Sequence, residues 1–282
     1  MVTAHLPAHI LRLAFRTGVL GCLLVLHHLT PATAQNTLIS PPGDQTTVTL
    51  ACNHFPPAKI ADDTARPGYD VEVLRSAFAT RNLTLITPFY PWKRAYFLAE
   101  AGLVDGLCSC SYLKERETDF LFSDPLGQEE IALFTTRSEI LDTITTLEDA
   151  RNMTIGVVSG YSTEVTARNA NLDVITAHDE ETLLNLMLSR RLDAVLSFKP
   201  PVEYAMHELQ KRRPETVDIK SKVISTSPYY SCITRHTQNA DELLEQLNIG
   251  LKIIRENGTY DKILGKYGIS SGAKPDGPTF NR

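Results

Sequence analysis

The chain has 282 residues, of which 43% are hydrophobic and 22% are charged, the balance of an ordinary globular protein rather than a disordered or fibrous one. Its formal net charge is −5 and its pI is about 5.9. With no basic excess and no basic stripe, the sequence offers nothing for a nucleic-acid backbone, and we expect no nucleic-acid partner.

The N-terminus has the three-part layout of a secretory signal peptide. Arg12 and Arg16 supply positive charge, a short apolar run follows at 17–26, and Ala32-Thr33-Ala34 offers a small-x-small cleavage pattern. The apolar run is shorter than the roughly 20 residues that cross a bilayer, which disfavours an uncleaved anchor. We therefore predict that residues 1–34 are a cleaved signal peptide and that the mature protein is periplasmic.

Five cysteines occur in the chain, and the first lies within the predicted signal peptide. Val19-Leu20-Gly21-Cys22 loosely resembles a lipoprotein processing site, but leucine is bulky for that role, so we favour ordinary cleavage. An even number then remains in an oxidising compartment, which permits two disulfides. A soft metal held by Cys-x-Cys is the alternative, but no histidine stands at ligand spacing, and we predict no metal site. The four remaining cysteines are Cys52, Cys108, Cys110 and Cys232.

After a leader at 35–46 that is rich in Pro, Ser, Thr and Gly, strands and helices alternate. Continuous apolar runs indicate buried strands, and apolar residues at a spacing of three or four indicate helices. The elements predicted in this first round are a strand at 48–52, a helix at 69–80, a strand at 83–86, a helix at 92–101 and a strand at 104–109.

The same alternation then restarts and runs to residue 196. Two rounds of alternating strands and helices predict two α/β lobes with mostly parallel sheets. The predicted elements are strands at 131–134, 154–158, 174–175 and 194–196, a capped turn at 146–150, a helix after Tyr161 and a helix at 180–190.

Two helices close the chain. Residues 240–256 carry one apolar stripe, Asn257-Gly258 stops that helix, and a shorter helix is predicted at 260–267. The polar, Gly- and Pro-containing composition that follows predicts a disordered tail at 271–282.

Six phrases, in order along the chain, resemble one protein family. They are Gly-Tyr-Asp-Val-Glu-Val-Leu at 68–74, a Trp…Leu-x-x-x-Gly-x-Val-Asp pattern from 92 to 105, Glu-Arg at 115–116 followed by Phe-Ser-Asp-Pro at 122–125, Ile-Gly-Val-Val-Ser-Gly at 155–160, Arg-Leu-Asp-Ala at 191–194 within 183–196, and Asn-Gly-Thr-Tyr at 257–260 within 243–267. Together they resemble bacterial extracellular solute-binding protein family 3, the polar amino-acid-binding type that serves ABC transporters. The resemblance extends from about residue 47 to residue 268.

This resemblance implies a fold and a division into domains. The implied fold is the two-lobed type II periplasmic-binding-protein fold, in which each lobe is a mostly parallel sheet flanked by helices and two hinge strands join the lobes. Lobe one is expected to be discontinuous, comprising 47–126 plus 229–270, with lobe two at 127–228. The hinge crossings are expected near Pro125 and Pro228, with the ligand in the cleft at the carboxyl ends of the strands.

The family motif also implies how a ligand's carboxylate is held. Arg116 occupies the place of the arginine that grips the carboxylate through a bidentate fork, which suits guanidinium geometry. The plainer alternative is a surface ion pair with Glu115 or Glu117. Ser109 and Ser111 stand where family members offer further donors, although they could simply cap the end of a strand.

Aromatic residues are expected to form the walls of the site. Phe55 falls where the family places an aromatic ring over the ligand, and Trp92, Tyr69 and Tyr161 are further candidates. Core packing is the alternative for each of them. Arg94, two residues after Trp92, is a candidate second cation, with a solvated helix face as the alternative.

Departures from the family pattern bear on the ligand. The aspartate that pairs with the ligand's α-ammonium in amino-acid binders is replaced here by Phe198, and an unpaired buried ammonium costs several kcal/mol. The usual threonine three residues before the arginine is Leu113. These departures leave open a carboxylate without an α-amine, an aromatic acid, or a ligand held by Glu203 or Asp179.

The fold implied by the resemblance also places the cysteines. Cys108 and Cys110 alternate with Ser109 along a strand, so their sulfurs are expected to share one face. Cys52 and Cys232 are expected on the flanking strands. The three possible pairings are not distinguished by the sequence.

The function implied is that of a solute-binding protein, not an enzyme, with no cofactor. It would close by hinge motion around a small-molecule ligand and present it to a membrane permease or receptor, acting as a monomer. One alternative is a periplasmic dehydratase acting on a cyclic carboxylic acid, for which Glu203 or His178 would have to be the general acid or base. The other alternative is a ligand sensor that works through a partner.

Overall fold

The computed structural model describes residues 47–213 and 218–269. The predicted signal peptide, the leader up to residue 46 and the predicted tail at 271–282 lie outside the described residues. Within the described ranges, no helix combines the length and apolarity that a membrane span requires. The described residues all belong to one compact unit by their contacts.

Lobe one is the body packed around two apolar clusters that contain all four cysteines of the described chain. Its parallel strands are adjacent in the order β2-β1-β3, and β4 pairs with the far end of the last strand of the fold. The elements are β1 (Thr47–Ala51), α1 (Tyr69–Ala79), β2 (Thr84–Ile86), α2 (Trp92–Glu100), β3 (Gly106–Ser111), the 3-10 helix η1 (Lys114–Thr118), β4 (Phe120–Phe122), α7 (Ala240–Glu256) and α8 (Thr259–Lys266).

The apolar stripe predicted on the long C-terminal helix packs against the first helix of the fold. Leu244, Leu247 and Leu251 are buried in the same cluster as Leu74 and Phe78. The two helices approach closely at Gly250, where an added Cβ would lie 2.3 Å from the Ala77 carbonyl oxygen. This packing returns the C-terminal segment to the start of the chain and completes lobe one.

Lobe two is the body around a third, larger apolar cluster, which contains no cysteine among its described members. Its parallel strands are adjacent in the order β8-β6-β7. The elements are α3 (Ser138–Thr143), the 3-10 helix η2 (Leu147–Ala150), β6 (Thr154–Val158), α4 (Ser162–Asn169), β7 (Asp173–Ala177), α5 (Glu180–Leu188), β8 (Ala194–Phe198) and α6 (Lys199–Arg212).

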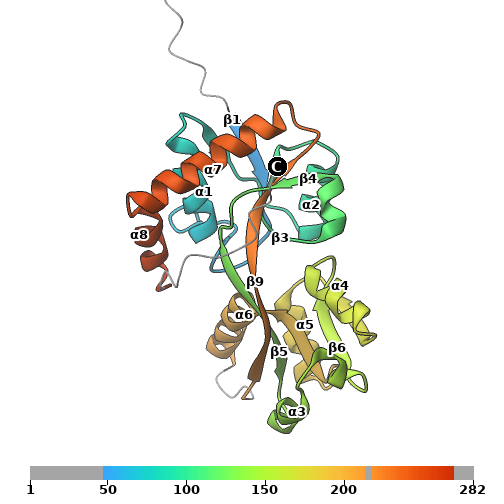
Figure 1. The fold of residues 1–282 in the computed structure, drawn as a ribbon. Helices are drawn as coiled ribbons and strands as arrows, with labels where there is room; N and C mark the ends of the chain where they lie inside the picture. Colours follow the sequence, from blue (N-terminus) through green and yellow to red (C-terminus); the bar gives the residue numbers. More distant parts are fainter. Residues whose placement is uncertain (1–46, 214–217, 270–282) are drawn as a thin grey trace, which may run out of the picture. The chain divides into compact units, whose positions relative to one another are not determined.

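Two long antiparallel strands run through both bodies. β5 (Gly127–Thr135) pairs with β9 (Lys220–Thr234) along its whole length, and Figure 1 shows the two side by side between lobe one and lobe two. β9 also pairs with β3, and β5 also pairs with β8, so the strands form one sheet in the order β2-β1-β3-β9-β5-β8-β6-β7. The sheet is therefore mixed, with parallel strands at its ends and antiparallel strands in the middle.

Most elements predicted from the sequence are present, and the α7 bounds agree with the prediction. Five elements were not predicted, namely η1, β4, α3, α6 and β9. The longest of them, β9, begins with a polar stretch whose side chains are largely exposed, so no apolar run marks it. The bounds predicted for the lobes, 47–126 plus 229–270 and 127–228, stay a prediction.

The four described cysteines form two disulfides, Cys52–Cys108 and Cys110–Cys232, with Cα–Cα distances of 5.1 and 6.3 Å. The expectation that Cys108 and Cys110 share one face is wrong, because they belong to different apolar clusters. β3 has one extra residue relative to β9 between Leu107 and Cys110, and this β-bulge interrupts the alternation of side chains. Each cysteine therefore bonds to a different neighbouring strand.

Candidate functional site

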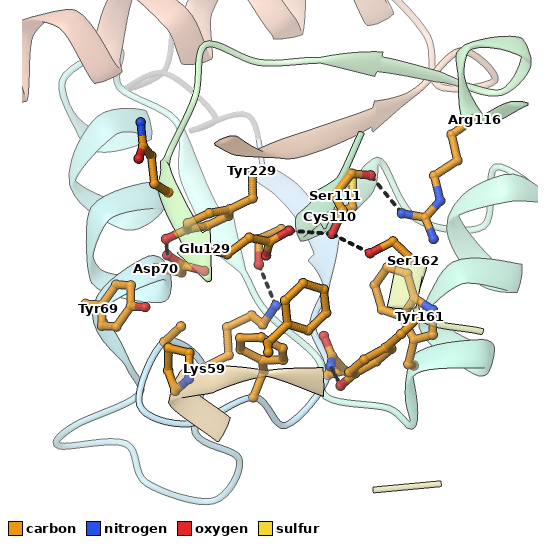
Figure 2. Close-up of a pocket in the computed structure, with 18 residues that line it drawn as sticks. Lys59, Tyr69, Asp70, Cys110, Ser111, Arg116, Glu129, Tyr161, Ser162 and Tyr229 are labelled. Atoms are coloured by element: carbon orange, nitrogen blue, oxygen red, sulfur yellow. Dashed lines mark hydrogen bonds between the residues drawn. The ribbon is translucent and has the colours of Figure 1, made fainter. Parts of the chain in front are cut away.

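A pocket lies at the carboxyl ends of β1 and β3, beside the N-termini of α1 and α4 (Figure 2). The space among its lining atoms, including the part open to solvent, is about 530 Å³, which suits a small molecule. Eight of the nine residues predicted for the ligand site line it: Phe55, Tyr69, Trp92, Ser109, Ser111, Arg116, Tyr161 and Phe198.

The ninth predicted residue, Arg94, does not line the pocket. It is exposed, and its guanidinium lies 5.7 Å from the centre of the Tyr90 ring. Trp92 and Arg94 are two residues apart on α2, and each helical residue turns the side chain by 100°, so the two point to nearly opposite faces. The alternative of a solvated helix face describes Arg94.

Arg116 enters the pocket from η1 and is only 5% exposed. Its Nη1 donates a hydrogen bond of 2.8 Å to the Ser111 carbonyl oxygen. The guanidinium carbon lies 5.4 Å from the ring centres of both Trp92 and Tyr96, within the range of a cation–π interaction. These contacts orient the buried guanidinium without neutralising its charge. The ion pairs of the described residues include none between Arg116 and Glu115 or Glu117, so the alternative of a surface ion pair is not what the structure shows.

A chain of hydrogen bonds connects the two lobes next to Arg116. The Ser162 hydroxyl donates to the Ser111 hydroxyl at 3.1 Å, and Ser111 donates to Oε1 of Glu129 at 2.6 Å (Figure 2). Ser162 is the first residue of α4, where the backbone N–H groups have no partner inside the helix. An anion beside Arg116 would therefore also meet the positive end of this helix.

At the other side of the pocket, Lys59 and Asp70 are brought together by the start of α1. The ammonium of Lys59 donates to the Ser109 hydroxyl at 2.5 Å, and the Tyr229 hydroxyl donates to Oδ1 of Asp70 at 2.7 Å. Gly68, with φ at +103°, caps α1 directly against the backbone of the segment before Lys59, where an added Cβ would lie 2.2 Å from the Ala58 oxygen. This close approach places the two charged side chains in one pocket.

The bulge in β3 brings three consecutive residues to the pocket. Ser109, Cys110 and Ser111 all line it, although a regular strand would turn the middle one away. β-Bulges re-aim side chains next to functional sites in this way. Both serine hydroxyls bond to charged side chains, Ser109 to Lys59 and Ser111 to Glu129.

Burial shifts the protonation of the acidic and basic groups here. It raises the pKa of Glu129 to about 7, against the opposing effects of the Ser111 hydrogen bond and the Lys59 charge. The pKa of Glu180 is likewise raised to about 7 by burial. Burial also raises the pKa of Asp70 and lowers that of Lys59, while the mutual attraction of these two groups opposes both shifts.

Aromatic side chains from both lobes form the apolar wall. Phe198 lies 5.4 Å from Phe55 and 5.6 Å from Tyr161, measured between ring centres. The Tyr161 hydroxyl accepts a hydrogen bond of 3.0 Å from Asn53, and the Trp92 indole donates one of 2.8 Å to the Gly160 carbonyl. Core packing and pocket lining are therefore not alternatives for these rings, since each ring has contacts of both kinds.

Three charged residues of the pocket were not predicted from the sequence: Lys59, Asp70 and Glu129. Asp70 lies within the Gly-Tyr-Asp phrase, and its position at the N-terminus of a predicted helix was a usable signal. Lys59 and Glu129 carry no local signal, because each becomes a pocket residue only through contacts with distant segments. Among the described residues, no group of three or more His, Cys, Asp or Glu side chains is placed to hold a metal ion.

Other candidates raised by the sequence lie outside the pocket. Glu203 on α6 is exposed, and the side chain of His178 is 78% exposed beside Asp179. The side chain of Asp179 caps α5 by accepting a hydrogen bond from the Thr182 N–H at 2.7 Å. None of these three lines the pocket.

Comparisons with known proteins give one family and one fold. A family model described as bacterial extracellular solute-binding proteins, family 3, matches residues 48–270. A probable histidine-binding protein of Neisseria gonorrhoeae is 21% identical over 213 residues, which cover 73% of this chain and 76% of that protein.

Two solved structures share the fold at low identity. A histidine kinase sensor domain with similarity to periplasmic binding proteins aligns with a TM-score of 0.68 at 21% identity, covering 80% of this chain and 97% of that one. An ancestral amino acid-binding protein, a precursor of cyclohexadienyl dehydratase, aligns with a TM-score of 0.64 at 19% identity, covering 78% and 94%. These likenesses confirm the predicted two-lobed type II periplasmic-binding-protein fold.

Proposed function

The chain belongs to family 3 of the bacterial extracellular solute-binding proteins, and from this premise we propose that it captures a small carboxylate-bearing ligand, an amino acid or a related organic acid, in the pocket between its lobes. It then delivers the ligand to a membrane transporter. The proposal includes export to the periplasm through cleavage after Ala34 and action as a monomer, since a protein that opens and closes around a ligand needs no second copy.

The observation that carries this proposal is the buried cation Arg116. A guanidinium that is 5% exposed, without an acidic partner within 4.0 Å among the described residues, needs an anion to offset its desolvation. Its planar fork fits a carboxylate, and the N-terminus of α4 beside it favours the same charge. The remaining aromatic wall supports a ligand with an apolar or aromatic body.

We propose capture rather than catalysis. The residues first considered as a general acid or base, Glu203 and His178, do not line the pocket. Members of this family are mainly binding proteins. The dehydratase alternative is retained only as an outcome of the test, because one structural relative is the precursor of such an enzyme.

The test is thermal unfolding of the purified protein with a panel of amino acids, keto acids, dicarboxylates and aromatic acids. A ligand at one hundred times its Kd stabilises the folded state by about 2.7 kcal/mol, which is a readily measured shift in Tm. The Arg116→Ala variant is expected to lose the shift, with a loss of affinity of roughly thirtyfold or more, because it removes the partner of a buried carboxylate.

Arg94→Ala is the matched control, since it removes the same charge from the exposed face of α2. It should retain the wild-type affinity. The proposal fails if no compound in the panel raises Tm, or if Arg116→Ala binds as well as Arg94→Ala. If chromatography shows that the protein consumes a cyclic carboxylic acid, the dehydratase function replaces capture as the proposed function.

A further inference from the structure

The charged side chains of the pocket are buried without direct ion pairs. Lys59, Asp70, Arg116 and Glu129 are each no more than 9% exposed. Among the described residues, no ion pair of 4.0 Å or less includes any of these four. Buried charges are normally paired, because desolvation is costly. A ligand with charges of both signs would supply the missing partners.

The two signs are also separated within the pocket. Figure 2 shows Arg116 at one side and Asp70 with Lys59 at the other, with Glu129 between them. The carboxylates of Asp70 and Glu129 both line the pocket on the Lys59 side of Arg116, and together with Glu180 outside the lining they act electrostatically on Lys59. Arg116 alone marks the opposite side. The arrangement fits a ligand that presents a carboxylate to Arg116 and a cation to the acidic side.

From this charge separation we propose that Glu129 holds the ammonium group of an amino-acid ligand, with Oδ2 of Asp70 as a second acceptor. This inference rests on the proposed function and assigns the residues that hold the ammonium group in the same pocket. It also assigns a ligand role to a residue of the strand β5 that runs through both lobes.

Glu129 is the primary acceptor because it has the weakest compensation inside the protein. The only hydrogen bond to its carboxylate among the described residues is the one from Ser111 to Oε1. Asp70 accepts a hydrogen bond from the Tyr229 hydroxyl, and Lys59 and the Ser109 hydroxyl further stabilise its charge, but its Oδ2 is buried without a partner at hydrogen-bond distance. An ammonium group can donate to both carboxylates at once, since it carries three N–H donors.

The assignment explains how an ammonium could be held despite Phe198. Phe198 is 4% exposed and packs against Phe55 and Tyr161, so it offers no charge to a ligand. The acidic groups on α1 and β5 take over that role from another part of the pocket. Phe198 is therefore compatible with a ligand that carries an amine, and an amine-free carboxylate was only one of the possibilities that the sequence left open.

The first experiment measures calorimetric Kd values for pairs of ligands that differ only in the α-amino group. The pairs are L-glutamate and glutarate, L-phenylalanine and 3-phenylpropanoate, and L-histidine and 3-(imidazol-4-yl)propanoate. In each pair that binds, the amino acid should bind roughly thirtyfold tighter or more. Equal or tighter binding of the amine-free member overturns the inference while leaving the proposed capture of carboxylates intact. If no member of any pair binds, and the wider panel gives none either, both proposals fall.

The second experiment uses Glu129→Gln, which keeps the shape and the acceptor oxygen but removes the charge. It should reduce the affinity for the amino acid by roughly thirtyfold and leave the affinity for the amine-free partner unchanged or higher. Glu130→Gln is the matched control on the next residue of β5, where the carboxylate pairs with Lys199 at 3.0 Å outside the pocket. If both variants have the same effect, Glu129 is not the ammonium acceptor.

The pH dependence of binding supplies a readout that a purely structural role would not produce. Glu129, with its pKa of about 7, faces Lys59, Asp70 and Arg116, together with the Ser111 hydroxyl. An ammonium lowers that pKa, so binding releases a proton, and affinity for the amino acid should rise from pH 6 to pH 8.

This rise should be smaller in Glu129→Gln. Glu180, which titrates in the same range, is present in both proteins, so the difference between their pH profiles belongs to Glu129. An affinity that falls from pH 6 to pH 8 in the wild type would mean that binding takes up a proton. That result would overturn the inference in favour of an amine-free anion.

Discussion

The two lobes are stabilised by different means. Lobe one contains both disulfides and the buried Lys59, Asp70 and Arg116, whereas the lobe-two cluster is built from aliphatic and aromatic side chains without a cysteine among its described members. Lobe two contributes mainly rings and the start of α4 to the pocket, through residues such as Tyr161, Ser162 and Phe198.

This difference indicates a division of roles. Buried charges destabilise a fold unless the surrounding structure holds them in place, and the disulfides constrain the strands from which lobe one presents them. An apolar lobe can cover the ligand and release it again without breaking an ion pair of its own.

Replacing Cys110 and Cys232 together by alanine should destabilise lobe one by about 2–5 kcal/mol, because it removes a bridge across 122 residues. Urea unfolding gives the total effect, and hydrogen exchange reports the lobes separately. Amides of β1 and β3 should lose protection while those of β6 and β8 retain theirs.

The matched control, the Cys52→Ala and Cys108→Ala double variant, opens a bridge across 56 residues and should cost roughly 0.7 kcal/mol less by loop entropy. Loss of protection first in β6 and β8 would contradict the division of roles.

In the absence of ligand, Glu129→Gln should stabilise the protein at pH 8 by roughly 1–3 kcal/mol. The folded-state pKa of about 7 lies above the ordinary value of 4.5, so the folded state binds more protons and stability falls as pH rises between these values. Urea unfolding at pH 4.5 should show little difference from the wild type, since the carboxyl group is then largely protonated in the folded state.

Glu180→Gln is the companion variant in lobe two, and it should also stabilise the protein at pH 8, because burial raises the pKa of Glu180 to about 7 as well. A stabilised Glu129→Gln protein that no longer prefers amino acids would show that binding, not folding, requires this charge. Destabilisation of Glu129→Gln at pH 8 would mean that the carboxylate is already compensated within the protein.

Removing the cap of α5 in lobe two by Asp179→Ala should cost about 1 kcal/mol, because the Thr182 N–H loses its acceptor. Ligand affinity should not change, since Asp179 lies outside the pocket. Lys211→Ala, which removes an exposed ion pair with Glu208, is the control and should change stability by less than about 0.5 kcal/mol. Chemical denaturation checks both values. A change in ligand affinity for Asp179→Ala would show that Asp179 contributes to ligand binding.

Local patterns in the sequence accounted for most of the fold and part of the site. The apolar periodicity of 240–256 predicts α7 with its bounds, because an amphipathic helix repeats its core positions every three or four residues. The motif position of Arg116 predicted a ligand-binding cation, and Arg116 is buried in a pocket that Tyr161 and Phe198 also line. Such features depend on neighbours in the chain, so the sequence alone carries them.

Tertiary contacts decided the rest. The pairing of the cysteines depends on one extra residue in β3, which no composition or periodicity reveals. The acidic side of the pocket depends on segments far apart in the chain, as Asp70 and Tyr229 are 159 residues apart and Lys59 and Ser109 are 50 apart. Arg94 was predicted as a site residue but lies outside the pocket, because the packing of α2 determines which of its faces meets the pocket. The sequence by itself therefore determined the family, the strands and helices with strong periodicity, and the place of Arg116 in the pocket. Only the folded chain decided which charged side chains meet, because burial and long-range packing set the surroundings of each charge.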